Sequence, residues 1–517
     1  MSAEIVTQPA VESEDRRRWL ALAVIVAAQF MVVLDISIVN VALPSIKTDL
    51  HFSQESLQWV LTGYSIFFGG FLLLGGRLGD LLGRRRLFMA GLLLFTVSSL
   101  LNGLSWSEGS LIAFRCLQGL GAGMMSPAAL SILTTTFEEG VERNRALGIW
   151  GAVAGSGGAV GVLLGGVLTS AFSWPWIFYV NVPVGLAVIA VSPFLLRESR
   201  ADLPSRQFDL AGAATITAGL MLLVYGMTHA AQHGWGTPET ISLLAASAVL
   251  IASFFLIESR TKAPLLPLRI FRLRTLTGSN VSALIAGGAV FSQFFLLTLY
   301  MQQVLHYSAL KTGVAYIALT VTSIGFSAVS QRLVTGLGVR RVLPAGLALS
   351  TVALLLYAQL PVDGHYFWDL FPAFIVSGLG LSLVFIPMAI GALTGVRPPD
   401  AGIASGLIST SQQIGGAIGV AAATTIATTF TSHYVTSHAG STPFSAPALV
   451  HGFSIAFYAL AGAAAVGAVL AALLIESQPA RARRESEVGE PQVAVASQYT
   501  PLCPETTATP SLSGSAG

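Results

Sequence analysis

Long apolar runs follow one another along almost the whole chain, and they restrict its fold more than any other feature. Each run is about 20 residues long, the length that an α-helix needs to cross a bilayer. Because the runs are continuously apolar and do not alternate with a period of two, they predict helices and exclude a membrane β-barrel. The sequence therefore predicts an all-α polytopic membrane protein with fourteen transmembrane helices. The runs lie at about 19–43, 57–76, 87–105, 110–135, 146–168, 174–196, 208–228, 240–258, 276–300, 312–330, 342–360, 367–394, 403–430 and 453–475.

The composition excludes several other classes of protein. Hydrophobic residues make up 53% of the 517 residues and charged residues 10%, whereas a soluble domain has about 25% charged residues. The runs leave no stretch long enough for a separate soluble catalytic domain, and the net charge of +2 gives no basis for nucleic-acid binding. Cys116 lies in an apolar run and Cys503 in a polar tail, so we expect neither a disulfide framework nor a thiolate metal site.

The positions of Lys and Arg predict the orientation of the helices. Positive residues concentrate in loops that stay in the cytoplasm. If fourteen helices are counted from a cytoplasmic N-terminus, almost all of the 27 Lys and Arg residues fall on the inner side. Lys47 and Lys311 fall on the outer side, and Arg115 lies within a run. We therefore expect both termini in the cytoplasm.

A decayed internal repeat predicts two related halves. The segment Gly76–Arg86 recurs as Gln331–Arg341, where Thr335 replaces Asp80, and Gly119-Leu120-Gly121 recurs as Gly378-Leu379-Gly380. Parallel six-helix halves are typical of transporters that hold substrate near the membrane midplane. The predicted parts are a cytoplasmic segment 1–18, a six-helix half 19–200, an inserted helix pair 201–262, a second six-helix half 263–476 and a disordered cytoplasmic tail 477–517.

Asp35 and Arg115 are the ionisable residues that fall deep within predicted helices. Each such charge costs about 2.5–3.5 kcal/mol on insertion scales, so both are expected to face the bundle interior or a wet cavity. A carboxylate that reaches water on alternate sides of the membrane can carry a proton across it. Arg115 stays charged, and Gln118 lies one turn later on the same helix face. We interpret these three residues as a proton-coupling set; the alternative is a structural charge near a helix end.

The inner loop between the second and third runs combines a glycine-rich turn with one acidic residue and a basic cluster. Anchoring by positive charge would explain the arginines but neither the glycines nor the aspartate. We interpret the loop as a conformational latch or gate on the cytoplasmic side. Its candidate residues are Gly76, Arg77, Asp80, Gly83, Arg84 and Arg85.

Glycines recur at intervals of three and four residues along the fifth run, and small residues at this spacing let helix backbones approach closely. Ordinary helix packing and a seam that slides between two states are equally consistent with this pattern. These glycines are Gly151, Gly155, Gly158, Gly161 and Gly165. In the second half, amide and aromatic side chains suggest a substrate cavity, although they are also consistent with packing. They are Gln293, Phe294, Gln412 and Gln413.

Several catalytic and cofactor motifs are missing from the sequence. It has no Gly-x-x-x-x-Gly-Lys-Ser/Thr loop for ATP, no complete dinucleotide fingerprint and no zinc-protease spacing. We therefore expect no enzyme activity, no cofactor and no metal.

These motifs together resemble the major facilitator superfamily, and within it the fourteen-span drug:proton antiporters of bacteria. The resemblance covers residues 19 to about 475 and includes the first-run segment Leu34–Pro44. It implies that Asp35 and Arg115 take part in proton coupling and that Asp80 with nearby arginines stabilises the state closed to the cytoplasm. It also implies hydrophobic drugs as substrates. Val162 stands where the family's span-five motif usually has proline, and Pro175 where arginine is common.

The predicted function is proton-coupled export of hydrophobic or amphiphilic drugs across the bacterial cytoplasmic membrane by alternating access. The expected partners are a hydrophobic small molecule, protons and lipid, with no nucleic acid, and the protein is expected to work as a monomer. One alternative is export of a single endogenous metabolite or antibiotic. Nutrient uptake is a weaker alternative, and a non-transporting receptor or scaffold would leave the buried charges unexplained.

Overall fold

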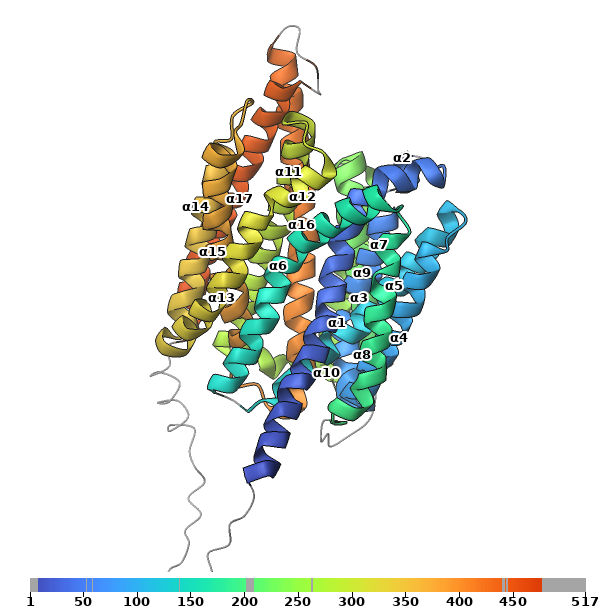
Figure 1. The fold of residues 1–517 in the computed structure, drawn as a ribbon, viewed down its shortest axis with the longest axis vertical. Helices are drawn as coiled ribbons and strands as arrows, with labels where there is room; N and C mark the ends of the chain where they lie inside the picture. Colours follow the sequence, from blue (N-terminus) through green and yellow to red (C-terminus); the bar gives the residue numbers. More distant parts are fainter. Residues whose placement is uncertain are drawn as a thin grey trace, which may run out of the picture. The chain divides into compact units, whose positions relative to one another are not determined.

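The computed structural model describes residues 8–52, 54–57, 59–138, 140–200, 209–261, 264–438, 442 and 445–476, and every regular element within them is a helix (Figure 1). The helices of the first part of the chain are α1 (Gln8–Asp49), α2 (Gln54–Leu57), α3 (Trp59–Leu82), α4 (Arg84–Gly103), α5 (Glu108–Thr136), α6 (Val141–Ala171), α7 (Trp176–Tyr179), α8 (Asn181–Leu195), α9 (Leu210–His233) and α10 (Pro238–Arg260). Those of the second part are η1 (Leu268–Arg272), α11 (Arg274–Leu299), η2 (Tyr300–Val304), α12 (Ala309–Ala315), α13 (Ile317–Leu337), α14 (Val339–Ala358), η3 (Tyr366–Leu370), α15 (Phe371–Leu393), η4 (Pro398–Asp400), α16 (Ala401–Ser437) and α17 (Ala446–Leu474).

Thirteen helical stretches among the described residues are long and apolar enough to cross a membrane, and a shorter apolar stretch, Val160–Ala171, lies at the end of α6. The predicted all-α polytopic fold is therefore confirmed. Some predicted spans consist of two consecutive elements, such as α7 with α8 and α12 with α13. Helix α1 begins at Gln8, so part of the predicted segment 1–18 is helical. Residues 1–7 and the predicted tail 477–517 lie outside the described residues.

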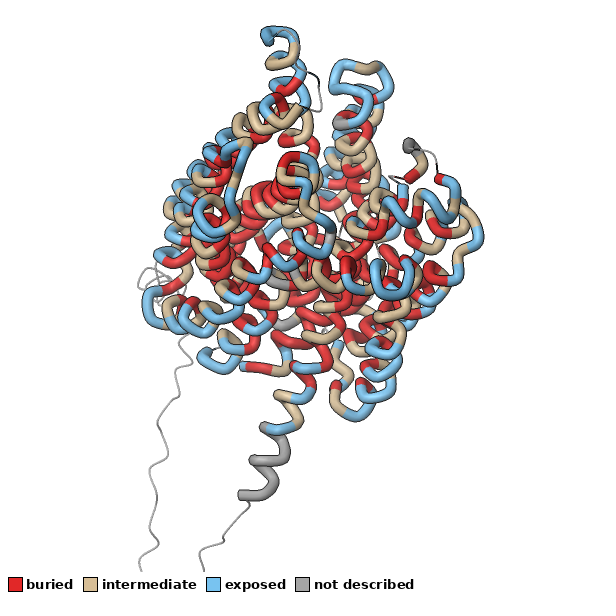
Figure 2. Tube along the Cα trace, turned by 45° about the horizontal axis from the view of Figure 1, so that its top comes forward, coloured by how far each residue is buried: buried red, intermediate tan, exposed pale blue. Residues whose placement is uncertain are grey.

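Buried residues fill the interior of the helix bundle, while exposed residues lie in loops and on the outer faces (Figure 2). Many of the exposed side chains are apolar, including Phe194, Val249 and Trp368. Exposed apolar side chains on a spanning helix contact lipid at no free-energy cost. The apolar runs of the sequence therefore provide both the core and the lipid-facing surface.

Two glycines of the internal repeat form equivalent turns. Gly83 separates α3 from α4 with φ of 115°, and Gly338 separates α13 from α14 with φ of 80°. Residues with a Cβ rarely adopt such φ values, so glycine is required where the chain reverses this sharply. The repeat therefore encodes a shared turn in addition to a pattern of charges.

Helix contacts also recur between the repeats. A Cβ added at Gly119 of α5 would collide with the backbone of Tyr64 in α3, and one added at Gly378 of α15 would collide with the backbone of Leu319 in α13. Similarly, Gly121 packs on the backbone of Phe95, and Gly380 on that of Ser350. The close packing of these helices has therefore been retained even where the side chains around it differ.

Two seams join the early and late helices. In one, α6 packs against α12, α13 and α15; in the other, α3 packs against α16. Helix α9 contacts both α3 and α16. The Trp59 and Tyr225 rings lie 5.4 Å apart between α3 and α9, and Trp235 Nε1, just after α9, donates a hydrogen bond of 2.8 Å to Thr425 Oγ1 of α16. Helix α9 and the turn after it therefore bridge the second seam.

Candidate functional site

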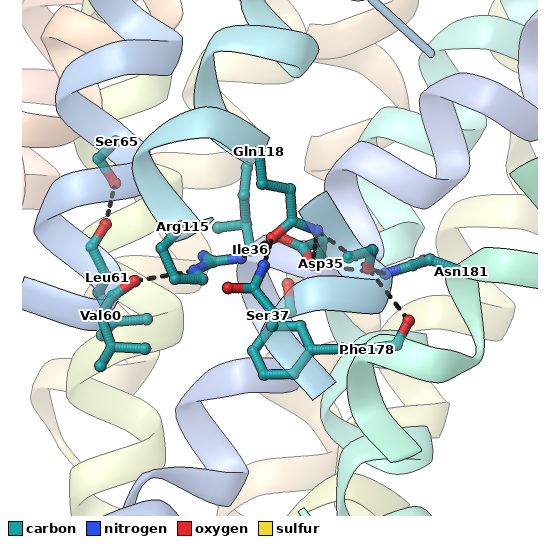
Figure 3. A network of polar contacts seen from close by, with 12 residues as sticks. Asp35, Ile36, Ser37, Val60, Leu61, Ser65, Arg115, Gln118, Phe178 and Asn181 are labelled. Atoms are coloured by element: carbon teal, nitrogen blue, oxygen red, sulfur yellow. Dashed lines mark hydrogen bonds and ion pairs between the residues drawn. The ribbon is translucent and has the colours of Figure 1, made fainter. Parts of the chain in front are cut away.

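A buried ion pair joins α1 and α5 inside the bundle (Figure 3). Arg115 Nη1 lies 2.6 Å from Asp35 Oδ2, and both residues are 0% exposed. Sequence reasoning identified these two residues but could not tell whether they meet. Because a lone charge in this apolar interior would be strongly unfavourable, each residue provides the main electrostatic compensation for the other.

Gln118 completes the predicted set and bonds to both members of the ion pair. Its Nε2 donates to Asp35 Oδ1 at 2.8 Å, and its Oε1 accepts from Arg115 Nη1 at 2.7 Å. Asn102 Nδ2 also donates to Gln118 Oε1 at 2.7 Å. Since two donors hold the amide oxygen, the amide nitrogen is directed at the carboxylate.

Three further polar residues that sequence reasoning missed belong to this network. Asn181, the first residue of α8, donates to Asp35 Oδ1 at 3.4 Å and to Ser99 Oγ at 3.2 Å. Ser99 also accepts from Gln118 Nε2 at 3.2 Å and donates to the carbonyl of Phe178. Together with Asn102, these residues connect α4 and α8 to the ion pair. The sequence feature that could have identified these three residues is that each is a polar side chain within an otherwise apolar run.

The rest of the Arg115 guanidinium is held by a carbonyl and by aromatic rings. Arg115 Nε donates to the carbonyl of Val60 at 2.9 Å. Its Cζ lies 4.4 Å from the centroid of the Tyr64 ring and 5.7 Å from that of Phe178. Arg115 therefore has favourable contacts in addition to the Asp35 carboxylate.

The predicted gate loop lies where α3 meets α16, at the end of the bundle that carries Arg84, Arg269 and Arg397; we call it the arginine-rich end. Asp80 accepts hydrogen bonds from Arg84 Nη2 at 2.8 Å and Nε at 3.1 Å, and both side chains are buried. A Cβ added at Gly402, in the first turn of α16, would lie 2.6 Å from Asp80 Oδ2. The carboxylate thus lies at the positive end of the α16 dipole.

Glycine makes this close approach possible. A Cβ on Gly76 would collide with the carbonyl oxygen of Gly402, and one on Gly406 would lie 2.8 Å from the carbonyl oxygen of Leu72. Arg77 is buried beside this contact, where it interacts electrostatically with Asp80, Asp400 and Glu258. The helix backbones of α3 and α16 are therefore in contact at the arginine-rich end.

The turn at Gly83 is also attached to the segment after α8. Arg84 N donates to the carbonyl of Ser199 at 3.0 Å, and Arg85 Nη1 donates to that of Leu196 at 3.1 Å. Glu198 lies 3.8 Å from Arg85, and a Cβ on Gly83 would lie 2.7 Å from its Oε1. All six predicted loop residues therefore lie at or near one junction of helices.

The second copy of the loop has lost its acidic residue but keeps Arg332, Arg340 and Arg341. Thr335, which replaces Asp80, accepts hydrogen bonds from Gln331 Nε2 at 3.1 Å and from Asn144 Nδ2 of α6 at 3.4 Å. The seam between α6 and α13 therefore has neutral hydrogen bonds at the position where the seam between α3 and α16 has the Asp80–Arg84 pair.

The glycine stripe of α6 contacts several helices. Cβ atoms on Gly161 and Gly165 would lie 2.9 and 2.8 Å from the carbonyl oxygens of Leu34 and Ile38 in α1. Gly151 packs on Ile386 of α15, and Gly158 lies between Ser37 and the Phe294 ring. Helix α6 is continuous through Val162, where the family pattern has proline. Gly155 lies within α6, but its surroundings are outside the described part of the chain.

The predicted cavity residues do not share one environment. Gln293 of α11 is buried, and its Nε2 donates to Ser377 Oγ of α15 at 2.8 Å. The two residues line a cavity of about 10 Å³. Such a cavity holds about one water molecule. Phe294 faces the α6 seam, the backbone of Gln412 packs on Gly287 of α11, and Gln413 is half-buried in α16. A larger ligand would need a different conformation around Gln293.

Comparison with known proteins identifies the family. Residues 25–420 match the sequence model of the Major Facilitator Superfamily. The chain belongs to this superfamily. As a member of it, the protein is a multi-pass membrane transporter and not an enzyme.

Relatives of this superfamily member cover most of its length. It is 38% identical over 499 residues to the puromycin resistance protein pur8 of Streptomyces alboniger, covering 96% of this chain and 98% of that protein. It is 41% identical over 416 residues to the cephamycin export protein CmcT of Amycolatopsis lactamdurans, covering 80% and 85%. The human organic anion transporter MFSD10 (TETRAN) shares the fold, with a TM-score of 0.61 at 16% identity over 88% of this chain and 99% of that one.

Proposed function

We propose that the protein exports hydrophobic or amphiphilic drugs across the bacterial cytoplasmic membrane in exchange for protons. The names of the two antibiotic resistance and export relatives support the substrate class. The observation that carries the proton coupling is the buried network of Asp35, Arg115 and Gln118, since it contains a carboxylate that can be neutralised by one proton.

Protonation of Asp35 would change the forces within this network. The ion pair with Arg115 at 2.6 Å would become a hydrogen bond to a neutral acid, which is weaker because one charge is lost. Helices α1 and α5 could then separate more easily. Release of the proton on the cytoplasmic side would restore the ion pair.

The domain organisation follows the internal repeat. We place the six-helix halves at 19–200 and 263–476, with residues 201–262 as an inserted pair. The concentration of arginine at one end supports a cytoplasmic location for that end and for both termini. The backbone contacts of Gly76 and Gly402 support a cytoplasmic gate that is closed in this conformation. Asp80, Arg84 and the first turn of α16 would form its latch.

Alternating access then requires the gate at α3 and α16 to separate while the α6 glycine stripe accommodates the movement. Phe294 lies against Gly158 at this seam, so it is a candidate substrate contact, together with the amide side chains of Gln293, Gln412 and Gln413. We propose that a monomer suffices, because both seams lie within one chain. Export of one endogenous antibiotic is the second candidate function, supported by the name of the cephamycin export relative.

The proposal is tested in proteoliposomes with an imposed proton gradient and a panel of lipophilic dyes and antibiotics. We expect the compounds to trigger proton flux with the wild type but not with Asp35→Asn. Exchange of labelled solute without proton flux would exclude proton coupling and retain transport. A response to one compound class alone would favour the dedicated exporter.

A further inference from the structure

We propose that Tyr64 is a positioning residue that stabilises the Arg115 cation while Asp35 is protonated, and that it thereby sets the pH at which Asp35 exchanges its proton. This inference rests on the proposed coupling role of Asp35. It concerns a residue of α3 that was not among the predicted coupling residues. The argument starts from the charge that remains when Asp35 becomes neutral.

A protonated Asp35 would leave Arg115 as an uncompensated cation in the membrane interior. Such a charge is strongly unfavourable unless other groups replace the lost anion. The carbonyl of Val60 and the amide oxygen of Gln118 provide two contacts, at 2.9 and 2.7 Å. The ring of Tyr64, 4.4 Å from Arg115 Cζ, provides a third. An aromatic face attracts a cation most strongly when both are desolvated, and Arg115 and Tyr64 are both buried.

The contribution of the ring differs between the two protonation states. When Asp35 is ionised, its carboxylate lies 2.6 Å from the guanidinium that the ring covers, so the ring meets a neutral ion pair and its attraction for the cation is partly offset by the nearby negative charge. When Asp35 is neutral, only the attraction remains. The Tyr64 ring therefore favours the protonated state of Asp35. Its removal would require a higher proton concentration to reach the same occupancy.

The burial of Tyr64 shows that its ring, rather than its hydroxyl group, makes the identifiable contacts. The side chain is 1% exposed, and its hydroxyl oxygen has no hydrogen-bond partner among the described residues. The ring also packs on Phe68, with centroids 5.7 Å apart. A phenylalanine would retain the face over Arg115, which provides a conservative control.

The internal repeat provides a natural comparison. Gly119 packs on the backbone of Tyr64, and its counterpart Gly378 packs on that of Leu319. In the same repeat, Arg115 corresponds to Phe374, which is buried among the rings of Tyr316 and Tyr357. The copy that lacks the cation thus also lacks the aromatic residue at the Tyr64 position.

The titratable groups around this site are few. Asp35 from α1 is the charged partner of Arg115, while α4 and α8 contribute the neutral residues Ser99, Asn102 and Asn181. Helix α5 also carries Cys116, whose Sγ would lie 3.0 Å from a Cβ on Gly63 of α3. A Cys116→Ser background removes the thiol from the titration and leaves the ion pair.

The test measures the pH dependence of two processes in Cys116→Ser and in Cys116→Ser carrying Tyr64→Phe or Tyr64→Leu. Titration of Asp35 is followed by infrared difference spectroscopy of the carboxyl group, assigned with Asp35→Asn. Substrate-triggered proton flux is measured in proteoliposomes. We expect Tyr64→Leu to lower both midpoints by about one pH unit, a tenfold change in proton concentration. Tyr64→Phe should shift them by less than about 0.5 unit.

An unchanged Asp35 midpoint in folded Tyr64→Leu would overturn the inference, even if the flux fell. An equal shift in Tyr64→Phe and Tyr64→Leu would also overturn it, because the hydroxyl and not the ring would then be responsible. If Cys116→Ser alone showed no coupled flux but the added Tyr64→Leu still shifted the Asp35 titration, the proposed coupling function would fail. The effect of the ring on Asp35 would stand.

Discussion

Asp80 of α3 faces Gly402 of α16 so closely that a methyl group at Gly402 would lie 2.6 Å from Asp80 Oδ2. This relationship joins a charged loop signature to a helix that begins more than half the chain later. It places a carboxylate at a helix N-terminus, where partial positive charge stabilises it. The proposed latch would therefore depend on a residue without a side chain as well as on the arginines.

Gly402→Ala should disrupt this junction, because the new Cβ would collide with Asp80 and with the backbone of Gly76. We expect at least a tenfold loss of transport and greater labelling of an introduced cysteine at the arginine-rich end. Gly462→Ala is the matched control, since a Cβ there would have no neighbour within 4 Å. Equal transport by both variants would show that the α3–α16 contact is not a gate.

Asp80→Asn should destabilise the protein more than Arg86→Gln. The first substitution removes the carboxylate charge that lies 2.8 Å from the buried Arg84, and breaking such a pair costs about 3–5 kcal/mol. The Arg86 side chain is 66% exposed and 3.7 Å from Glu198, and exposed pairs contribute about 0–1 kcal/mol. Thermal unfolding in detergent measures the difference. A similar melting temperature for the two variants would contradict a structural role for the Asp80–Arg84 pair.

Asn102→Leu should weaken coupling without removing either charge. It eliminates one of the two donors that hold Gln118 Oε1, so the Gln118 amide can rotate away from Asp35. We expect about a tenfold drop in proton flux per substrate, corresponding to about 1.4 kcal/mol. Ser105→Ala, two residues after the end of α4, is the control, because within the described part of the chain the Ser105 hydroxyl donates to the Leu101 carbonyl and not to Gln118. An unaltered flux ratio in Asn102→Leu would mean that Gln118 needs no such support.

The hydrogen bond between Trp235, just after α9, and Thr425 of α16 should contribute to the transport rate. Trp235→Phe and Thr425→Val each remove the 2.8 Å bond, which is worth about 0.5–1.5 kcal/mol. We expect about a threefold change in transport rate for each and no further change in the double variant. Thr428→Val is the control, since its hydroxyl bonds to carbonyls of its own helix. Additive effects would show that the two residues act independently.

Much of the fold could be predicted because membrane solvation acts on each segment separately. A run such as 342–360 must become a helix in lipid whatever its neighbours are, since its backbone groups have no other partners there. The repeat also predicted related turns, and Gly83 and Gly338 both have the positive φ that only glycine adopts readily. The start of α1 at Gln8 was missed because its first turns are polar.

The sequence alone determined that Asp35 and Arg115 are charges within apolar helices, because the insertion penalty depends on residue type and depth. Only the tertiary structure decided that they form one pair and that Gln118, Asn102 and Asn181 converge on it. It also decided that Tyr64 covers the cation and that Gly402 meets Asp80. These contacts depend on how separate helices rotate and pack, and the packing is determined by interactions among all of them at once rather than by the hydropathy of any one segment.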